Sequence, residues 1–305
     1  MRFLRFASTA AGMDTFLQQV LTGLATGGVY ASIALALVMI FQATSFVNFA
    51  QGEMAMFSTY LAWQLIDGGL SYWAAFALTL VISFAGGVVL ERILIRPMEN
   101  APVLSIVIIT LGLLVIFNSV AGWIWSYVIK SFPSPFPADP IHLGTFVFGP
   151  HSLGVIAVTL LLLALLFVFF RFTPLGLAMR AATQNPISSR LVGIRVGWMR
   201  ALGWGLAALL GAVAGLLIAP IVFLEPNMMG GILIYGFAAA TLGGLASPGG
   251  AVLGGFLVGV IENLAATYVP FIGTELKLTV ALAVIIGVLL VKPSGLFGRA
   301  EVRRV

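Results

Sequence analysis

Acidic and amide side chains stand inside several long apolar stretches of this sequence. Glu53 follows Asn48 and Gln51, and Glu262 interrupts a second apolar stretch. If these stretches lie in a membrane, a carboxylate there costs about 2.5–3.5 kcal/mol on insertion scales and must face a cavity or a partner. Glu53 then either contributes to a path for a polar solute or marks the interfacial end of a helix. Glu262 either contributes to such a path or pairs with a basic group on another helix.

The directions of these side chains depend on whether the helix is continuous. On an unbroken helix, Asn48 and Gln51 share a face and Glu53 is turned about 200° from Gln51. A break near Gly52 would change that relation. Thr241 precedes a glycine pair where an unwound backbone could expose carbonyls and amides to a cavity, although a small-residue packing face is the simpler interpretation. The expected path residues are Asn48, Gln51, Glu53, Thr241 and Glu262.

Motifs for catalysis are absent from the sequence. There is no Gly-x-x-x-x-Gly-Lys-Ser/Thr phosphate-binding loop, no Gly-x-Ser-x-Gly nucleophile elbow and no His-Glu-x-x-His zinc motif. The chain has no cysteine, and its two histidines, His142 and His151, lack a third ligand. We therefore predict no catalytic residue, metal or cofactor. If the chain works with ATP, another polypeptide must hydrolyse it.

The composition requires a membrane around these polar residues. Of 305 residues, 61% are hydrophobic and only 8% are charged, whereas soluble domains carry about 25% charged residues. So few charges cannot cover a globule of this size with a solvated surface, which excludes a soluble enzyme, a nucleic-acid-binding protein and a disordered chain. The net charge of +5 then reports orientation in the bilayer and not a nucleic-acid partner.

Stretches without charged residues predict the membrane-spanning helices, each needing about 20 apolar residues. The clear helices are expected at about 16–41, 71–90, 103–126, 152–170, 201–224 and 277–292. The stretch 229–269 is long enough for two helices, divided at Ser247-Pro248-Gly249-Gly250, and 46–66 is a weaker span. The prediction is an all-α, polytopic transmembrane helix bundle. It forms a single domain over residues 1–305, with about eight or nine spans and at least one broken or re-entrant helix.

Arginine placement predicts which side each connection faces. Residues 171–200 contain five arginines and no acid, the strongest cytoplasmic signal in the chain. The segment 91–99, with Arg92 and Arg96, and the C-terminal tail also contain arginines and are expected inside. The segments 127–150, 225–228 and 270–276 carry little positive charge and are expected outside. Arg2 and Arg5 conflict with three candidate spans before residue 91. Either 46–66 is broken or re-entrant, the N-terminus lies outside, or Met13 is the true start.

The basic connection 171–200 is also the best candidate for a partner contact. Pro174 and Gly176 open it, residues 177–183 can form one or two helical turns, and Pro186 stops or restarts the helix. A short cytoplasmic helix between two spans suits docking to another protein. The simpler alternative is a basic connector held at anionic headgroups.

Four groups of residues resemble one transporter family. Residues 176–194, with the pattern Gly-x-x-Met-Arg-Ala-Ala-x-x-Asn followed by Gly-Ile, resemble the cytoplasmic loop of the branched-chain amino-acid ABC importer permeases. Residues 48–53 are similar to that family's Asn-Phe-Ala-His-Gly-Glu segment, with Gln51 in place of His. The segments 91–112 and 243–254 are similar to its third-to-fourth helix junction and its glycine-rich late hairpin. The four segments are distributed along the sequence, and the resemblance covers most of the chain.

The resemblance implies a multi-pass permease of the bacterial inner membrane. It implies a second homologous permease subunit, two cytoplasmic ATP-binding subunits and a periplasmic substrate-binding protein as partners, besides the lipid bilayer. It also implies that the residues coupling the chain to the ATPase are Gly176, Arg180, Ala181, Asn185, Gly193 and Ile194.

Other functions remain open on the sequence alone. Branched-chain amino acids are the expected solutes, and relatives of the same kind handle urea, short amides or other small carboxylates. A different class is a proton-coupled secondary transporter that uses Glu53 or Glu262 as its proton site. The third alternative is a channel or a membrane scaffold. A selective ion pore is disfavoured because the sequence has few embedded charges and no charged ring.

Overall fold

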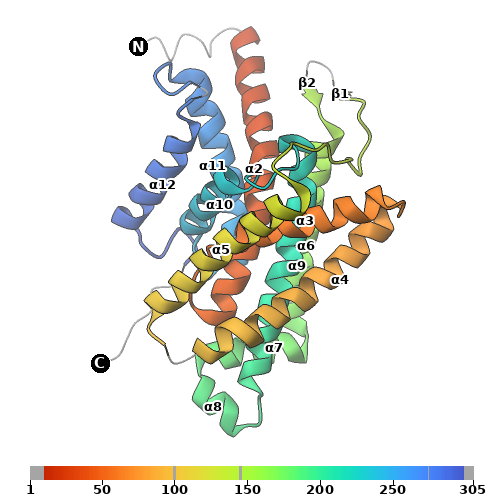
Figure 1. Ribbon diagram of the computed structural model, residues 1–305. Helices are drawn as coiled ribbons and strands as arrows, with labels where there is room; N and C mark the ends of the chain where they lie inside the picture. Colours follow the sequence, from red (N-terminus) through yellow and green to blue (C-terminus); the bar gives the residue numbers. More distant parts are fainter. Residues whose placement is uncertain (1–9, 99–100, 144–145, 274, 299–305) are drawn as a thin grey trace.

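The computed structural model describes residues 10–98, 101–143, 146–273 and 275–298. They form a helix bundle with one short β-hairpin (Figure 1). The helices are α2 (Ala10–Thr44), α3 (Gln51–Asp67), α4 (Tyr72–Leu90), α5 (Val103–Trp125), α6 (Pro150–Phe172), α7 (Pro174–Gln184), α8 (Pro186–Leu191), α9 (Val196–Val222), α10 (Gly230–Gly243), α11 (Pro248–Tyr268) and α12 (Lys277–Val291). Strand β1 (Ile141–Leu143) pairs antiparallel with β2 (Phe146–Phe148).

Six helices of the described chain are long and apolar enough to cross a bilayer, namely α2, α4, α5, α6, α9 and α11. Helices α3, α10 and α12 are shorter, with 17, 14 and 15 residues. Fourteen residues extend about 21 Å, less than the hydrocarbon core of about 30 Å. The all-helical transmembrane class is therefore confirmed, whereas the predicted eight or nine spans are not confirmed by helix length.

The helix boundaries follow local sequence signals. The predicted division of 229–269 is present, because α10 ends at Gly243 and α11 begins at Pro248. The Oγ of Ser247 caps α11 by accepting the backbone N–H of Gly250 at 3.0 Å. At the end of α4 the chain continues through a π-helical segment, η1 (Glu91–Ile95), and a 3₁₀ turn, η2 (Arg96–Met98).

A break separates the first two helices. Helix α2 ends at Thr44, Ser45 adopts the left-handed region with φ +62°, and α3 begins only at Gln51. The interruption therefore covers residues 45–50 and ends just before Gly52, the residue near which the sequence analysis considered a break. Because α3 begins after this turn, it starts inside the bundle and packs mainly on α9, α4 and α5.

The two ends of the bundle are distinct. Helices α7 and α8 project at the bottom of Figure 1, and the β1–β2 hairpin lies at the top. Helix α9 runs between these two ends. The last turns of α9 lie near the hairpin end, because the ring of His151, at the start of α6 just after the hairpin, contacts the backbone oxygen of Leu217 at 2.7 Å. At the other end Arg96 donates to the backbone oxygen of Gly197 at 2.7 Å, so η2 lies beside the α7–α8 end.

This arrangement bears on the parity conflict in the sequence. Helices α2, α3 and α4 connect the top of the bundle in Figure 1, where α2 begins, to the α7–α8 end, where η2 lies. The described start of α2 and the segment 91–98 therefore lie at opposite ends of the bundle. Arg2 and Arg5, which created the conflict, lie outside the described residues.

Glycine pairs bring α2 and α11 into close contact at the centre of the bundle. A Cβ placed on Gly27 would lie 2.7 Å from the Cα of Phe256, and one on Gly259 would lie 2.4 Å from the backbone oxygen of Gly23. Only glycine permits this backbone approach. The core is consequently formed by the buried faces of α2, α9, α10 and α11, with α3 against α9.

The outer helices carry their apolar side chains on the surface. In α4, α5 and α6 only about a fifth of the most apolar segment is buried, and exposed residues include Val81, Ile108 and Leu161. Such continuous apolar surface matches hydrocarbon or another membrane subunit, and not water.

Candidate functional site

The predicted path residues Asn48 and Gln51 are fully buried at the break and hold it in shape. The side-chain oxygen of Asn48 accepts the backbone N–H of Ala50 at 3.0 Å, and its amide donates to the side-chain oxygen of Gln51 at 3.3 Å. The amide of Gln51 donates to the backbone oxygen of Ala207 in α9 at 2.9 Å. These contacts fix the start of α3 against α9.

Glu53 points away from this group and toward α5. Its carboxylate is 6% exposed and accepts a hydrogen bond of 3.4 Å from the side-chain amide of Asn118. The same amide donates to the backbone oxygen of Pro226 and the side-chain oxygen of Asn227, at 2.9 and 3.1 Å. Among the described residues, Glu53 has no cationic partner. This Glu53 cluster joins α3, α5 and the α9–α10 connection.

Two short helices begin beside this cluster. A Cβ placed on Gly52 in the first turn of α3 would lie 3.2 Å from the Cβ of Met229, which immediately precedes α10. Neither helix start has a side-chain cap. Uncapped amide groups at a helix N-terminus carry partial positive charge and favour anions. The site therefore brings together a buried carboxylate and two electropositive helix ends.

Glu262 belongs to a separate network that includes Tyr30 of α2. Its carboxylate is 3% exposed, accepts a hydrogen bond of 2.6 Å from Tyr30 and lies 3.6 Å from the ammonium of Lys277. Tyr30 stacks on Tyr235 with ring centroids 4.4 Å apart. Glu262 therefore pairs with a basic group on another helix, which is one of the two alternatives given by the sequence analysis. The network of these four side chains joins α2, α10, α11 and α12.

Thr241 lies at the opposite end of α10 from the Glu53 cluster. The helix is intact through Gly243, and the unwound backbone begins at Gly244, which has φ +102°. The segment before the C-terminus covers this end, because the backbone N–H groups of Leu296 and Phe297 donate to Leu242 and Gly243. The structure thus does not bring Thr241 together with Glu53.

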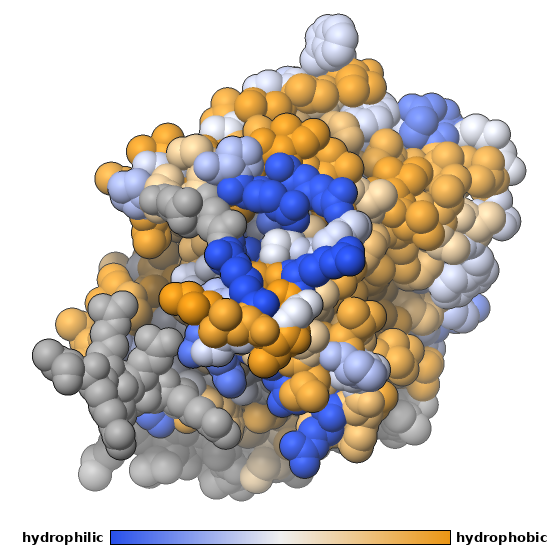
Figure 2. All heavy atoms as spheres, turned by 90° about the horizontal axis from the view of Figure 1, so that it is seen from below, coloured by the Kyte–Doolittle hydropathy of each residue, from blue (hydrophilic) through white to orange (hydrophobic). Residues whose placement is uncertain are grey.

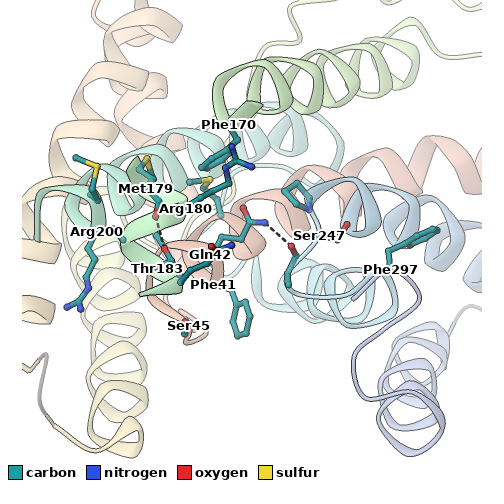
Figure 3. Close-up of a pocket in the computed structure, with 17 residues that line it drawn as sticks. Phe41, Gln42, Ser45, Phe170, Met179, Arg180, Thr183, Arg200, Ser247 and Phe297 are labelled. Atoms are coloured by element: carbon teal, nitrogen blue, oxygen red, sulfur yellow. Dashed lines mark hydrogen bonds between the residues drawn. The ribbon is translucent and has the colours of Figure 1, made fainter. Parts of the chain in front are cut away.

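A chamber of about 720 Å³ opens near the α7–α8 end (Figure 3). The end of α2, α7, the start of α9 and the α10–α11 connection line it. Its polar residues include Gln42, Ser45, Thr183 and Arg180, and Met39, Met179 and Phe170 contribute apolar surface. Gln42 donates to the backbone oxygen of Ala246 at 2.9 Å, which ties the end of α2 to the turn before α11.

The residues predicted for ATPase coupling divide into two groups. Gly176 and Asn185 shape α7 and α8: a Cβ on Gly176 would collide with the backbone of Phe169, and the side-chain oxygen of Asn185 caps α8 by accepting the N–H of Ser188 at 2.9 Å. Arg180 lines the chamber, and Ala181 is half-buried beside it. Gly193 has φ +86° and, with Ile194, forms the turn into α9.

The most exposed part of this region is an apolar tip that the sequence analysis missed. Ile187, Leu191 and Val192, called here the α8 tip, are 74%, 84% and 76% exposed. Figure 2 shows the molecule from below, where hydrophilic side chains gather toward the centre of the view and hydrophobic ones surround them. Apolar residues separated by four or five positions around Ser188 and Arg190 were the available signal for this surface.

Partners of the embedded carboxylates were also not predicted. Asn118 and Asn227 were not associated with Glu53, and Tyr30 and Lys277 were not associated with Glu262. A bundle with an embedded carboxylate, half-length helices beginning in its interior and a projecting helical pair at one end has the features of a membrane transport subunit.

Comparison with known proteins identifies the family. The family model described as branched-chain amino acid transport system / permease component matches residues 19–289. The permease protein LivH of a high-affinity branched-chain amino acid transport system from Escherichia coli is 31% identical, covering 95% of this chain and 98% of LivH. BraD of Pseudomonas aeruginosa, with the corresponding description, is 32% identical over 95% and 98%. The chain belongs to this permease family and is a transport subunit, not an enzyme.

Proposed function

We propose that the chain is the membrane-spanning subunit of an ATP-driven importer that moves branched-chain amino acids into the cytoplasm. The observation that carries the proposal is the match to permeases of branched-chain amino acid transport systems over nearly the whole length of both chains. Since the chain has no phosphate-binding loop, the energy comes from two cytoplasmic ATP-binding subunits. A second homologous permease and a periplasmic binding protein complete the importer in the bacterial inner membrane.

The α7–α8 end faces the cytoplasm in this proposal, and the β1–β2 hairpin faces the periplasm. Five arginines between residues 171 and 200 support this orientation. Nine helices then lie in the membrane, because α3, α10 and α12 occupy the interior or the edge of the bundle between longer helices. The start of α2 is periplasmic and the end of α12 is cytoplasmic.

The absence of cysteine allows a direct test of this orientation. Ser188→Cys in α8 and Ser131→Cys in the α5–α6 connection are both exposed positions. We expect a membrane-impermeant maleimide to label Ser131→Cys in intact spheroplasts and Ser188→Cys only in inside-out vesicles. The opposite labelling pattern would reverse the whole arrangement.

The Glu53 cluster is the proposed site for the charged end of the amino acid. A zwitterion carries an ammonium that suits the carboxylate of Glu53, and a carboxylate that suits the uncapped starts of α3 and α10. Asn48 and Gln51 position this site through the break. The chamber near α7 is where the solute reaches the cytoplasmic side.

Coupling to ATP hydrolysis runs through α7 and α8. Helix α7 follows α6 directly at Thr173, which caps it, and packs on both α6 and α9. A displacement of the α7–α8 pair by the ATP-binding subunits therefore moves helices that line the chamber and the Glu53 cluster. Gly176, Arg180, Ala181, Asn185, Gly193 and Ile194 retain the coupling role proposed for them.

The decisive measurement is uptake into liposomes that contain the complete importer with ATP inside and the binding protein outside. We expect ATP-dependent uptake of leucine. Glu53→Gln should lower leucine uptake at least tenfold and leave basal ATP hydrolysis unchanged. Uptake of urea but not of leucine would show that the proposed substrate is wrong. Uptake by the chain alone under a proton gradient would show that the protein is a secondary transporter and not part of an ATP-driven importer.

A further inference from the structure

A second cavity, of about 620 Å³, lies between α6 and the start of α11. Most of its wall is apolar, formed on α6 by Leu160, Leu163, Phe167 and Phe170. Two arginines, Arg171 at the end of α6 and Arg180 in α7, line its end nearest α7. We call this cavity the α6–α11 groove.

The groove has the depth of one membrane leaflet. From Leu160 to Arg171 it follows α6 for about three helical turns, about 16 Å at about 1.5 Å per residue. Half of a hydrocarbon core of about 30 Å is about 15 Å. The apolar wall thus covers the length of an acyl chain in the leaflet on the α7–α8 side, and the arginines lie at the level of the headgroups.

The positive charge at this end has no neutralising partner among the described residues. Arg171 and Arg180 make no hydrogen bond or ion pair with any residue in the described part of the chain. No acidic residue occurs between positions 171 and 200. Pro248 and Gly249, in the first turn of the 21-residue helix α11, line the same end and add the partial positive charge of a helix start.

We propose that the α6–α11 groove is a binding site for an anionic phospholipid of the cytoplasmic leaflet. Its phosphate contacts Arg171 and Arg180, and one acyl chain lies along Leu160, Leu163 and Phe167. Basic pockets between helices on the cytoplasmic side select anionic headgroups because opposite charges meet at low dielectric. The charge and the single-leaflet depth favour a lipid over a second protein subunit as the occupant.

A bound lipid would also have a mechanical effect. It would connect α6, α7 and the start of α11, the elements that border both the groove and the chamber, since Arg180 and Ser247 line both cavities. The proposal depends on the cytoplasmic assignment of α7 and α8, and not on which solute is transported.

The test is lipid retention, measured by native mass spectrometry of the protein in mild detergent with equal amounts of phosphatidylglycerol and phosphatidylcholine. We expect the wild-type protein to retain phosphatidylglycerol preferentially. A juxtamembrane arginine contributes about fivefold to such binding, so Arg171→Gln with Arg180→Gln should reduce the preference roughly 25-fold. Arg190→Gln, which changes an exposed arginine of α8 outside the groove, is the matched control and should leave the preference unchanged.

A second variant tests the apolar part of the groove. Ala164 lines it and is exposed, so Ala164→Trp fills the groove without disturbing the core. This variant should reduce retention of both lipids while the protein remains folded by circular dichroism. Unchanged phosphatidylglycerol retention in the double arginine variant, or an equal loss in Arg190→Gln, would overturn the proposal. Loss of permease pairing with unchanged lipid retention in Ala164→Trp would assign the groove to a protein partner.

Discussion

The α8 tip provides a sharp test of how the chain is coupled to its ATP-binding subunits. Leu191 is 84% exposed at the end of α8, and its neighbours Ile187 and Val192 are exposed to a similar degree. Large apolar side chains gathered at the water-facing end of a membrane protein indicate a contact with another protein. The informative perturbation is Leu191→Ser, which removes the apolar side chain and keeps a short side chain at the end of α8.

The expected magnitude follows from the area that docking would cover. Full burial of a leucine side chain contributes about 1.5–3 kcal/mol, and Leu191 has most of its surface available. A loss of about 2 kcal/mol corresponds to a dissociation constant roughly 30-fold larger. The folded permease itself should change by no more than about 0.5 kcal/mol, because the side chain makes little contact within the chain.

The assay measures binding and coupling separately. Binding of the purified ATP-binding subunit to permease in nanodiscs gives the dissociation constant, and ATP hydrolysis with and without the loaded binding protein gives the coupling. We expect Leu191→Ser to weaken binding roughly 30-fold and to reduce stimulated hydrolysis in proportion, with an unchanged unfolding temperature of the permease.

A matched variant separates apolar docking from electrostatic attraction. Arg190→Gln alters the neighbouring residue and removes a surface charge, which contributes no more than about 1 kcal/mol, or about fivefold in binding. If Arg190→Gln weakened binding more than Leu191→Ser, the contact would be electrostatic. If Leu191→Ser bound within twofold of the wild type, the α8 tip would not be the docking surface.

Three further predictions concern the interior of the bundle. Gln51→Leu removes the side-chain hydrogen bond to the backbone oxygen of Ala207 and should cost about 0.5–1.5 kcal/mol of stability in detergent unfolding. Gln51→His, which restores a ring N–H donor and the residue usual in the family, should recover most of this loss. Gly259→Ala should lower the stability of the bundle by about 3 kcal/mol or more, because a Cβ there would lie 2.4 Å from backbone atoms of α2. Gly287→Ala is the control: a Cβ there has nothing within 4 Å, so the stability should be unchanged or slightly higher in the same measurement. Tyr30→Phe removes a hydrogen bond to the buried carboxylate of Glu262 and should lower stability by about 1.5–3 kcal/mol, with no effect on ATPase binding.

The helices could be predicted from the sequence because hydrocarbon excludes charge. The expected helix at 103–126 is α5, and the proline and glycines after Ser247 divide α10 from α11 as expected. In both cases the signal is local: an uninterrupted apolar stretch in one, a helix cap followed by proline in the other. The close approach of Gly27 to Phe256 of α11, by contrast, joins segments far apart in the sequence and was not predicted.

The candidate sites could be predicted only in part, because their partners come from distant segments. Glu53 stood out as an embedded acid, but its hydrogen-bond partner Asn118 is 65 positions away, and Tyr30 and Glu262 are 232 positions apart. Arg180 was selected by its motif, yet helical geometry turns it toward the chamber while Leu191 occupies the exposed tip. Sequence spacing within a helix does not reveal which face the rest of the bundle covers.

The two embedded carboxylates looked alike in the sequence, and their surroundings now distinguish them. Both should cost about 2.5–3.5 kcal/mol in an apolar setting, so each requires compensation. Glu262 receives it from the ammonium of Lys277 and the hydroxyl of Tyr30, which leaves little demand for another cation. Glu53 has an amide donor at 3.4 Å and no cation among the described residues. A transported ammonium group would supply the missing opposite charge, so Glu53, and not Glu262, is the carboxylate whose neutralisation should abolish amino-acid transport while leaving the fold intact.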